Sequence, residues 1–179
     1  MPAADRQRLF FALWPPEDVA GALHRVARQI QASHGGRAMR RDTLHLTLAF
    51  LGDVPVAAMN RVLAAASAVA PGAPFTFNLD TLGYWRHNCI VWASPGHPPP
   101  AMARLAGDLQ DSLRSEGFDL ESRPFRPHLT LLRKVVSAPE LPSLPALTWP
   151  VDGFSLVASE LSHEGARYRV LGRWPLAKS

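Results

Sequence analysis

Cysteine and lysine are scarce in this chain of 179 residues: Cys89 is the one cysteine, and Lys134 and Lys178 are the two lysines. A single cysteine cannot form an internal disulfide, so we expect a protein of the reducing cytoplasm. Cys89 begins an apolar run, and we expect a buried small side chain there. Long apolar runs are missing, so no segment is predicted to span a membrane. The run Leu9–Trp14 is too short for a signal peptide and stops at two prolines.

Motifs that bind metals and nucleotide cofactors are absent as well. The chain has no His-Glu-x-x-His and no cysteine pair. It also has no Gly-rich phosphate loop and no dinucleotide-binding fingerprint. We therefore expect an activity that needs neither a metal ion nor another cofactor.

The composition is that of an ordinary globular protein, with 47% apolar and 19% charged residues. The formal net charge is +4, and arginine supplies 17 of the 19 basic residues. The planar guanidinium group pairs well with phosphate, which favours a nucleotide or RNA as partner. A GC-rich genome also enriches arginine, alanine and proline, so we assign only a few of the arginines to phosphate binding.

The most informative feature is a phrase that occurs twice, as His45-Leu46-Thr47-Leu48 and as His128-Leu129-Thr130-Leu131. Both copies are expected in β-strands. Because successive side chains of a strand point to opposite faces, the histidine and the threonine share one face and the two leucines share the other. We predict that the leucine face is the core side of each strand.

Apolar periodicity and turn residues predict the elements around these motifs. Helices are expected from Pro16 to Gly35, from Val56 to Ala70 and from Pro98 to Gly117. Strands are expected at Arg8–Trp14, Leu44–Leu51, Phe75–Trp85, Cys89–Ala93, Pro127–Arg133, Phe154–Leu161 and Tyr168–Leu176. We expect a turn at Gly52-Asp53 and a loop that crosses between lobes over the proline-rich segment Pro139–Pro150.

A helix precedes each motif at nearly the same distance, since the first begins near Pro16 and the third near Pro98. This spacing indicates an internal duplication. We predict an α+β fold of two similar lobes, each an antiparallel sheet backed by helices and related by a pseudo-twofold axis. Residues 1–179 would form one bilobal domain with the active site in the cleft between the facing sheets.

Two histidines in one cleft can divide the work of acid–base catalysis. One imidazole accepts a proton from water, and the other donates a proton to a leaving alkoxide. Thr47 and Thr130 point into the same cleft and can hydrogen-bond a phosphoryl oxygen. The alternative is two half-buried strands with polar outer faces. We interpret the remaining histidines as surface or core residues: His24, His34, His87, His97 and His163.

Arg133 follows His128 by five residues and is a candidate for stabilising negative charge in a transition state. In a regular strand, an offset of five places Arg133 on the face opposite His128. The strand must therefore end or bulge before Arg133, or the side chain must reach around the edge.

Three segments together resemble the 2H phosphoesterases: His-x-Thr-Leu-x-Phe-Leu-Gly at 45–52, Pro-His-Leu-Thr-Leu-Leu-Arg at 127–133 and Arg-Leu-Phe-Phe-Ala at 8–12. They are most similar to the RNA 2′,3′-cyclic phosphodiesterases, historically called 2′-5′ RNA ligases. Segments 155–161 and 168–176 resemble the same branch. Ala49 departs from this pattern, where the family often has lysine, and Trp14-Pro15-Pro16 replaces a frequent polar turn.

The resemblance implies hydrolysis of a 2′,3′-cyclic phosphate, on RNA ends or small cyclic nucleotides, to a 2′-phosphate without a metal ion. It implies that His45 donates a proton to the leaving O3′ and that His128 accepts a proton from water. It also implies that Thr47, Thr130 and Arg133 bind the phosphate.

A nucleotide contact at Phe10 is implied as well, and its alternative is a core residue of an apolar strand. Two other functions stay open at this point. One is a non-catalytic RNA- or nucleotide-binding module of the same fold, and the other is the reverse reaction, 2′-5′ RNA ligation, with a 5′-hydroxyl in place of water. We expect a monomer.

Overall fold

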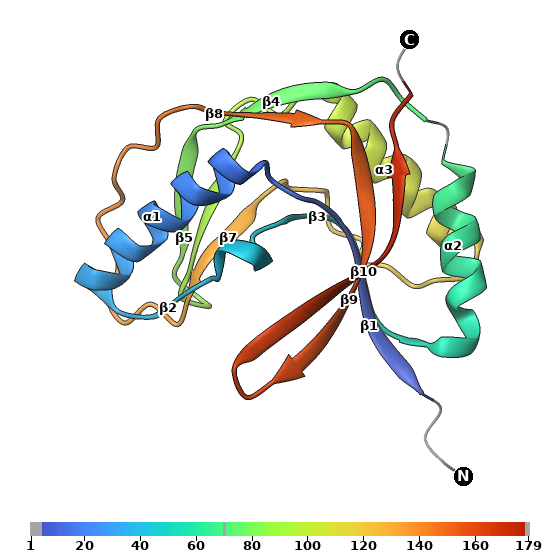
Figure 1. Ribbon diagram of the computed structural model, residues 1–179, viewed down its shortest axis with the longest axis horizontal. Helices are drawn as coiled ribbons and strands as arrows, with labels where there is room; N and C mark the ends of the chain where they lie inside the picture. Colours follow the sequence, from blue (N-terminus) through green and yellow to red (C-terminus); the bar gives the residue numbers. More distant parts are fainter. Residues whose placement is uncertain (1–4, 70, 178–179) are drawn as a thin grey trace.

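The computed structural model describes residues 5–69 and 71–177 and confirms the α+β class (Figure 1). The helices are α1 (Glu17–His34), α2 (Met59–Ala68) and α3 (Pro100–Ser115), with short 3₁₀ helices η1 (Arg41–Thr43) and η2 (Val56–Ala58). The strands are β1 (Arg6–Leu13), β2 (Arg37–Ala38), β3 (Leu46–Pro55), β4 (Phe75–Leu79), β5 (Thr81–Trp85), β6 (Ile90–Ser94), β7 (Leu129–Arg133), β8 (Leu147–Val151), β9 (Gly153–Ser162) and β10 (Gly165–Pro175).

The strands form one eight-stranded antiparallel sheet and one two-stranded sheet. The large sheet has the order β10-β9-β1-β3-β7-β6-β5, with β2 paired to β7. The small sheet consists of β4 and β8. The β9–β10 hairpin, red in Figure 1, is long and extends outward at one end of the molecule. Within the described residues, no helix is long and apolar enough to cross a membrane.

The helices bury their apolar faces against one face of the large sheet. Glu17 and Asp18 lie in the first turn of α1, where acidic groups complement the helix dipole. Leu23 of α1 and Leu109 of α3 are fully buried and share one core with the leucines of both motif strands. Burial of each such leucine stabilises the fold by about 1.5–3 kcal/mol. The polar residues of the motifs consequently lie on the opposite, open face.

The two motif strands are neighbours at the centre of the large sheet. β3 and β7 pair antiparallel at Leu46 and Leu129. The structure thus differs from the expected pair of separate, facing sheets, because this pairing joins the strands of both motifs into the one eight-stranded sheet. In this register His45 lies opposite Thr130 and His128 lies opposite Thr47, with all four on one face.

Each motif strand carries a β-bulge at the same position. The register of β3 against β1 skips Leu48, and the register of β7 against β6 skips Leu131. Both leucines are buried and lie three residues after the motif histidine. An extra residue shifts the alternation of side chains by one. The residues five positions after the histidines, Phe50 and Arg133, therefore return to the open face.

Two strands differ from their predicted extents because of tertiary pairing. The segment predicted as one strand, Phe75–Trp85, is broken at Asp80 into β4 and β5, which belong to different sheets. The proline-rich segment predicted as a loop contains all of β8 except Val151, and β8 pairs with β4. Pro150 is tolerated in β8 because each strand of a two-stranded sheet has a free edge.

Local geometry also differs at three places. The turn predicted at Gly52-Asp53 lies inside β3, where Gly52 adopts a φ of +70°, a conformation that glycine reaches without strain. The helix predicted from Val56 begins as η2, and its predicted end at Ala70 lies outside the described residues. Cys89 is half-buried in the β5–β6 turn with a φ of +57°, rather than buried in a strand.

Candidate active site

A pocket of about 120 Å³ lies on the open face of the sheet, at the junction of β3 and β7. The structure brings five of the six candidate residues to this pocket, together with two residues that the sequence did not indicate. The lining residues are Met39, Thr43, His45, Thr47, His128, Thr130 and Arg133. The other histidines do not line this pocket.

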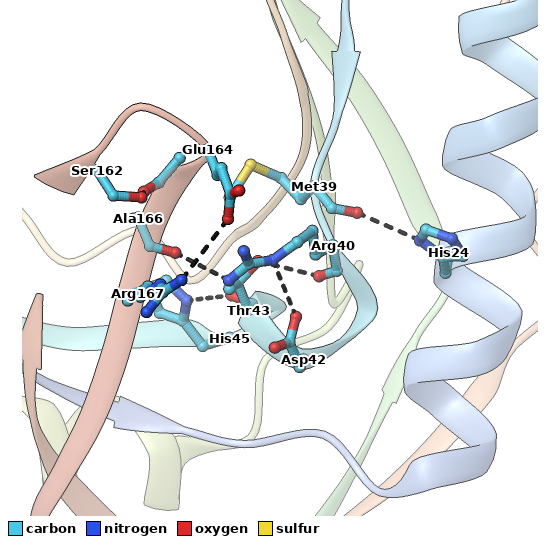
Figure 2. Close-up of polar contacts among 11 residues, drawn as sticks. His24, Met39, Arg40, Asp42, Thr43, His45, Ser162, Glu164, Ala166 and Arg167 are labelled. Carbon is cyan, nitrogen blue, oxygen red and sulfur yellow. Dashed lines mark hydrogen bonds and ion pairs between the residues drawn. The ribbon is translucent and has the colours of Figure 1, made fainter. Parts of the chain in front are cut away.

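Both motif histidines are oriented by the same kind of hydrogen bond. Nδ1 of His45 lies 2.8 Å from the carbonyl oxygen of Thr43 (Figure 2), and Nδ1 of His128 lies 2.8 Å from that of Arg126. A carbonyl oxygen only accepts hydrogen bonds, so Nδ1 carries the proton and donates it in each case. Nε2 of each imidazole is thereby left to accept a proton when neutral or to donate one when charged.

Aromatic side chains surround His45 on several sides. The ring of Phe10 stacks on the imidazole at 4.7 Å, and the rings of Tyr168 and Trp14 lie 5.3 and 5.7 Å away. This burial lowers the pKa of His45 below its usual value, and the positive charges of Arg133 and His128 lower the pKa further. The His45 imidazolium is consequently a stronger acid than an exposed one.

A second aromatic group supports His128. The ring of Trp85 meets the imidazole edge-on at 4.7 Å, and Trp92 packs against Trp85 at 5.5 Å. Trp92 lies directly over Gly83 in the paired strand: an added Cβ at Gly83 would be 2.0 Å from the indole. The lack of a side chain at Gly83 thus allows Trp92 to support Trp85 beneath His128.

Arg133 reaches the pocket because of the bulge at Leu131. In a regular strand Arg133 would lie on the face opposite His128, and the extra residue returns it to the same face. The strand neither ends early nor requires the side chain to pass around an edge. The backbone N–H of Met39 donates to the carbonyl oxygen of Leu131 at 2.8 Å, which satisfies the bulged residue. Arg37 pairs with Arg133 in the β2–β7 register, so two guanidinium groups start from adjacent positions.

The segment between β2 and η1 is tied to the β9–β10 hairpin next to His45 (Figure 2). The Arg40 guanidinium donates to the carbonyl oxygen of Ala166 at 2.9 Å and pairs with Asp42 at 3.2 Å. The Arg40 carbonyl oxygen in turn accepts a hydrogen bond of 3.0 Å from the Thr43 hydroxyl. Arg40 therefore connects the hairpin that carries Tyr168 to the loop that orients His45.

Phe10 is only 4% exposed and forms the support beneath His45. Its contact with a nucleotide stays a prediction. Two of the remaining histidines make hydrogen bonds elsewhere in the fold: His24 Nδ1 lies 3.2 Å from the Met39 carbonyl oxygen, and His34 Nδ1 lies 3.1 Å from the Ser137 hydroxyl. No group of three or more His, Cys, Asp or Glu among the described residues is arranged to hold a metal ion.

Sequence reasoning missed the residues that surround the two motif histidines or line the pocket with them: Trp14, Met39, Thr43, Trp85, Trp92 and Tyr168. Thr43 lies two residues before His45, but it ends η1, so strand alternation does not identify it. The others come from strands and loops whose pairing partners cannot be identified from one sequence.

Both the sequence and the fold of this chain match known proteins. Residues 15–162 match the family model of the 2′-5′ RNA ligase superfamily. The RNA 2′,3′-cyclic phosphodiesterase of Escherichia coli K12 is 34% identical over 178 residues, covering 98% of this chain and 99% of that protein. The RNA 2′,3′-cyclic phosphodiesterase of Thermus thermophilus is 35% identical over 182 residues, covering 94% and 90%.

Solved structures agree with these sequence matches. The crystal structure of E. coli LigT complexed with 3′-AMP superposes with a TM-score of 0.85 at 33% identity, covering 97% of this chain and 100% of that chain. The apo form of E. coli LigT superposes with a TM-score of 0.87 at 34% identity, covering 97% and 99%.

Proposed function

This chain belongs to the 2′-5′ RNA ligase superfamily, and from this premise we propose its reaction. We propose that it hydrolyses 2′,3′-cyclic phosphates of RNA ends or nucleosides to 2′-phosphomonoesters without a metal ion. The observation that carries this proposal is the antiparallel pair Leu46–Leu129. This pair places two imidazoles and two threonine hydroxyls around one pocket.

In the proposed reaction, one histidine accepts a proton from the attacking water and the other donates a proton to the leaving oxygen. Neutral His128 accepts a proton on Nε2 from a water molecule, whose oxygen attacks phosphorus. The bond between phosphorus and O3′ breaks, and the His45 imidazolium donates its Nε2 proton to the leaving O3′. The product is a 2′-phosphate with a free 3′-hydroxyl. Exchange with solvent then restores both protonation states.

The pocket also supplies groups for the negative charge that develops on the phosphoryl oxygens. We propose that the hydroxyls of Thr47 and Thr130 donate hydrogen bonds to the two non-bridging oxygens. Each threonine lies opposite the other motif's histidine in the β3–β7 register, on the same face of the sheet. The Arg133 guanidinium would bind the same oxygens through its planar fork.

The environment of His45 bears on its assignment as the acid. Burial and nearby cations lower the pKa of His45, and a bound anionic phosphate would oppose this effect and favour the imidazolium form that donates the proton. An analogue with sulfur in place of O3′ tests this assignment, because a thiolate leaves without protonation. We expect the analogue to restore the rate of His45→Ala but not of His128→Ala. The opposite pattern would exchange the two roles.

The experiment that tests the function is incubation with adenosine 2′,3′-cyclic monophosphate in the presence and absence of EDTA. We expect adenosine 2′-monophosphate in both samples. A lack of product would support a non-catalytic binding module, and loss of activity with EDTA would contradict a metal-free reaction.

We also propose that residues 1–179 form one domain of two half-repeats related by a local twofold axis. The bulges at equal motif positions, the equal histidine–carbonyl hydrogen bonds and the antiparallel pairing of equivalent leucines support this. Because both histidines come from one chain, the site is complete in the proposed monomer, which light scattering would test. The scarcity of cysteine supports the cytoplasm as place of action, which cell fractionation would test.

A further inference from the structure

The two motifs supply matched groups to the catalytic pocket. Nδ1 of each motif histidine donates to a backbone carbonyl oxygen at 2.8 Å, and Thr47 and Thr130 lie opposite the histidines in the β3–β7 register. A 2′,3′-cyclic phosphate, by contrast, has two ribose oxygens bonded to phosphorus, O2′ and O3′. Matched groups on both sides do not decide which of these oxygens leaves. The choice must therefore depend on residues outside the two motifs.

A larger groove adjoins the pocket on the side of His45. It has a volume of about 490 Å³ and lies between the β9–β10 hairpin and the segment that leads to η1. His45 and Thr47 line this groove, whereas His128 and Thr130 do not. In phosphoryl transfer the attacking and leaving oxygens lie roughly in line on opposite sides of phosphorus. A nucleoside in the groove would therefore direct its leaving oxygen toward His45 and leave the side of His128 to water.

Tyr168 of β10 is the aromatic residue with a hydroxyl at the junction of pocket and groove. Its ring meets the His45 imidazole edge-on at 5.3 Å and the Phe10 ring at 5.2 Å. The side chain also lines the groove. On the other side of the pocket, the aromatic neighbour of His128 is Trp85, which lines neither the pocket nor the groove. Tyr168 thus makes the surroundings of the two histidines unequal.

The other aromatic neighbours of His45 offer no polar atom to a ligand. Phe10 has none, and the indole N–H of Trp14 is buried. The Tyr168 hydroxyl has no hydrogen-bond partner within the described residues, and it is not one of the buried polar atoms there. Because Tyr168 lines the groove, its hydroxyl is open to a ribose that lies in the groove.

The Tyr168 hydroxyl is a hydrogen-bond donor at neutral pH. Burial raises the pKa of Tyr168 above its usual value, so the phenol keeps its proton. Positive charges oppose this rise without reversing it, and they belong, largest first, to Arg133, Arg40 and Arg8. Arg133 also lines the catalytic pocket. The hydroxyl consequently lies in the field of the same guanidinium group that would bind the phosphate.

We propose that the Tyr168 hydroxyl donates a hydrogen bond to the leaving O3′ and thereby selects O3′ over O2′ as the oxygen that leaves. Negative charge develops on O3′ as its bond to phosphorus breaks. Tyr168 stabilises this charge and keeps its own proton, while Nε2 of His45 delivers the proton that O3′ takes up. This inference rests on the proposed cyclic phosphodiesterase function and adds the residue that fixes the product as a 2′-phosphate.

Tyr168→Phe is the variant that tests this role, because it removes the hydroxyl and keeps the ring beside His45. On adenosine 2′,3′-cyclic monophosphate we expect kcat/KM to fall by about 2- to 13-fold, the range that corresponds to one hydrogen bond between neutral groups. The ratio of adenosine 2′-monophosphate to adenosine 3′-monophosphate, measured by chromatography of labelled products, should fall by the same factor. Only the route that breaks the bond from phosphorus to O3′ loses a hydrogen bond.

The analogue with sulfur in place of O3′ gives a second measurement. A thiolate leaves without a hydrogen-bond donor, so Tyr168→Phe should hydrolyse this analogue at about the wild-type rate. A structural defect would instead slow both substrates alike. Tyr84→Phe is the matched control, because Tyr84 is the other tyrosine of the chain and lies in β5, outside the pocket and the groove. It should keep the wild-type kcat/KM and product ratio.

The outcomes separate the role of Tyr168 from the reaction itself. Equal loss on the oxygen and sulfur substrates, no loss on either, or a product ratio that stays at the wild-type value would overturn the role of Tyr168. Each of these results would leave the phosphodiesterase function in place. Failure of wild type to hydrolyse either substrate would overturn the proposed function.

Discussion

Gly83 provides a test of how the sheet positions His128. An ideal Cβ added at Gly83 lies 2.0 Å from Cζ2 of Trp92, whereas ordinary contacts begin near 3.4 Å. In Gly83→Ala the indole must therefore move by about 1.4 Å, and Trp92 supports Trp85, whose ring meets His128 at 4.7 Å. The substitution would therefore disturb the His128 imidazole, although Gly83 itself does not line the pocket.

The expected magnitudes follow from overpacking and from misplacement. Overpacking of this kind costs about 1–3 kcal/mol of unfolding free energy. For a chain of this size that is a fall in Tm of about 2–12 °C, measured by calorimetry or circular dichroism. A displacement of His128 by about 1 Å would lower kcat by up to ~10²-fold.

Gly107 is the matched control. Gly107 lies inside α3, and outside the adjoining helix backbone no atom of the described residues lies within 4 Å of an added Cβ. Gly107→Ala should therefore stabilise the protein by up to ~1 kcal/mol and leave kcat unchanged. A Gly83→Ala variant with wild-type Tm and wild-type kcat would refute the supporting role of Trp92. Recovery of Tm in Gly83→Ala combined with Trp92→Leu would assign the damage to the clash.

Four further predictions concern the pocket itself. Thr47→Ala and Thr130→Ala should each lower kcat by about 10²–10³-fold, because each removes one donor to a phosphoryl oxygen, and initial rates within threefold of wild type would contradict this. Arg133→Lys should be clearly defective because lysine keeps the charge but loses the fork; a kcat/KM near wild type for both Lys and Ala at this position would remove Arg133 from the site. In a histidine NMR titration, His45 should titrate below pH 6.5, since burial and the charges of Arg133 and His128 oppose protonation. Inorganic phosphate should raise that pKa, because an anion favours the imidazolium, and a free-protein value at or above 6.5 would contradict the burial of His45. The pH dependence of kcat/KM should be a bell whose two limbs belong to the coupled histidine pair, and a monotonic rise from pH 5 to pH 9 would oppose the two-histidine mechanism.

The sequence predicted the central geometry because strand parity is a local property. His45 and Thr47 share a face, and the flanking leucines are buried, as alternation requires. The α+β class and the helix that precedes each motif were also predictable from local patterns. The two motifs form one site only if their strands are neighbours, and the Leu46–Leu129 pair makes them neighbours.

The bulges could not be located from one strand alone. Whether Leu131 is an extra residue depends on how β7 pairs with β6, and the sequence of β7 only posed the parity problem at Arg133. The same holds for β8, where Pro150 argued against a strand until β4 supplied a two-stranded sheet. The aromatic surroundings of His45 combine Phe10 and Tyr168, which are far apart in the sequence, so their contact depends on the tertiary fold.

The most direct test of the central claim is a comparison of kcat/KM on adenosine 2′,3′-cyclic monophosphate for wild type, His45→Ala, His128→Ala and the double variant, with Tm measured for each. If the two imidazoles act as one acid–base pair, each single substitution should lower kcat/KM by about 10²–10⁴-fold. The double variant should then be little worse than either single variant. A well-folded single variant that keeps more than a tenth of wild-type activity, or losses that multiply in the double variant, would contradict the paired mechanism.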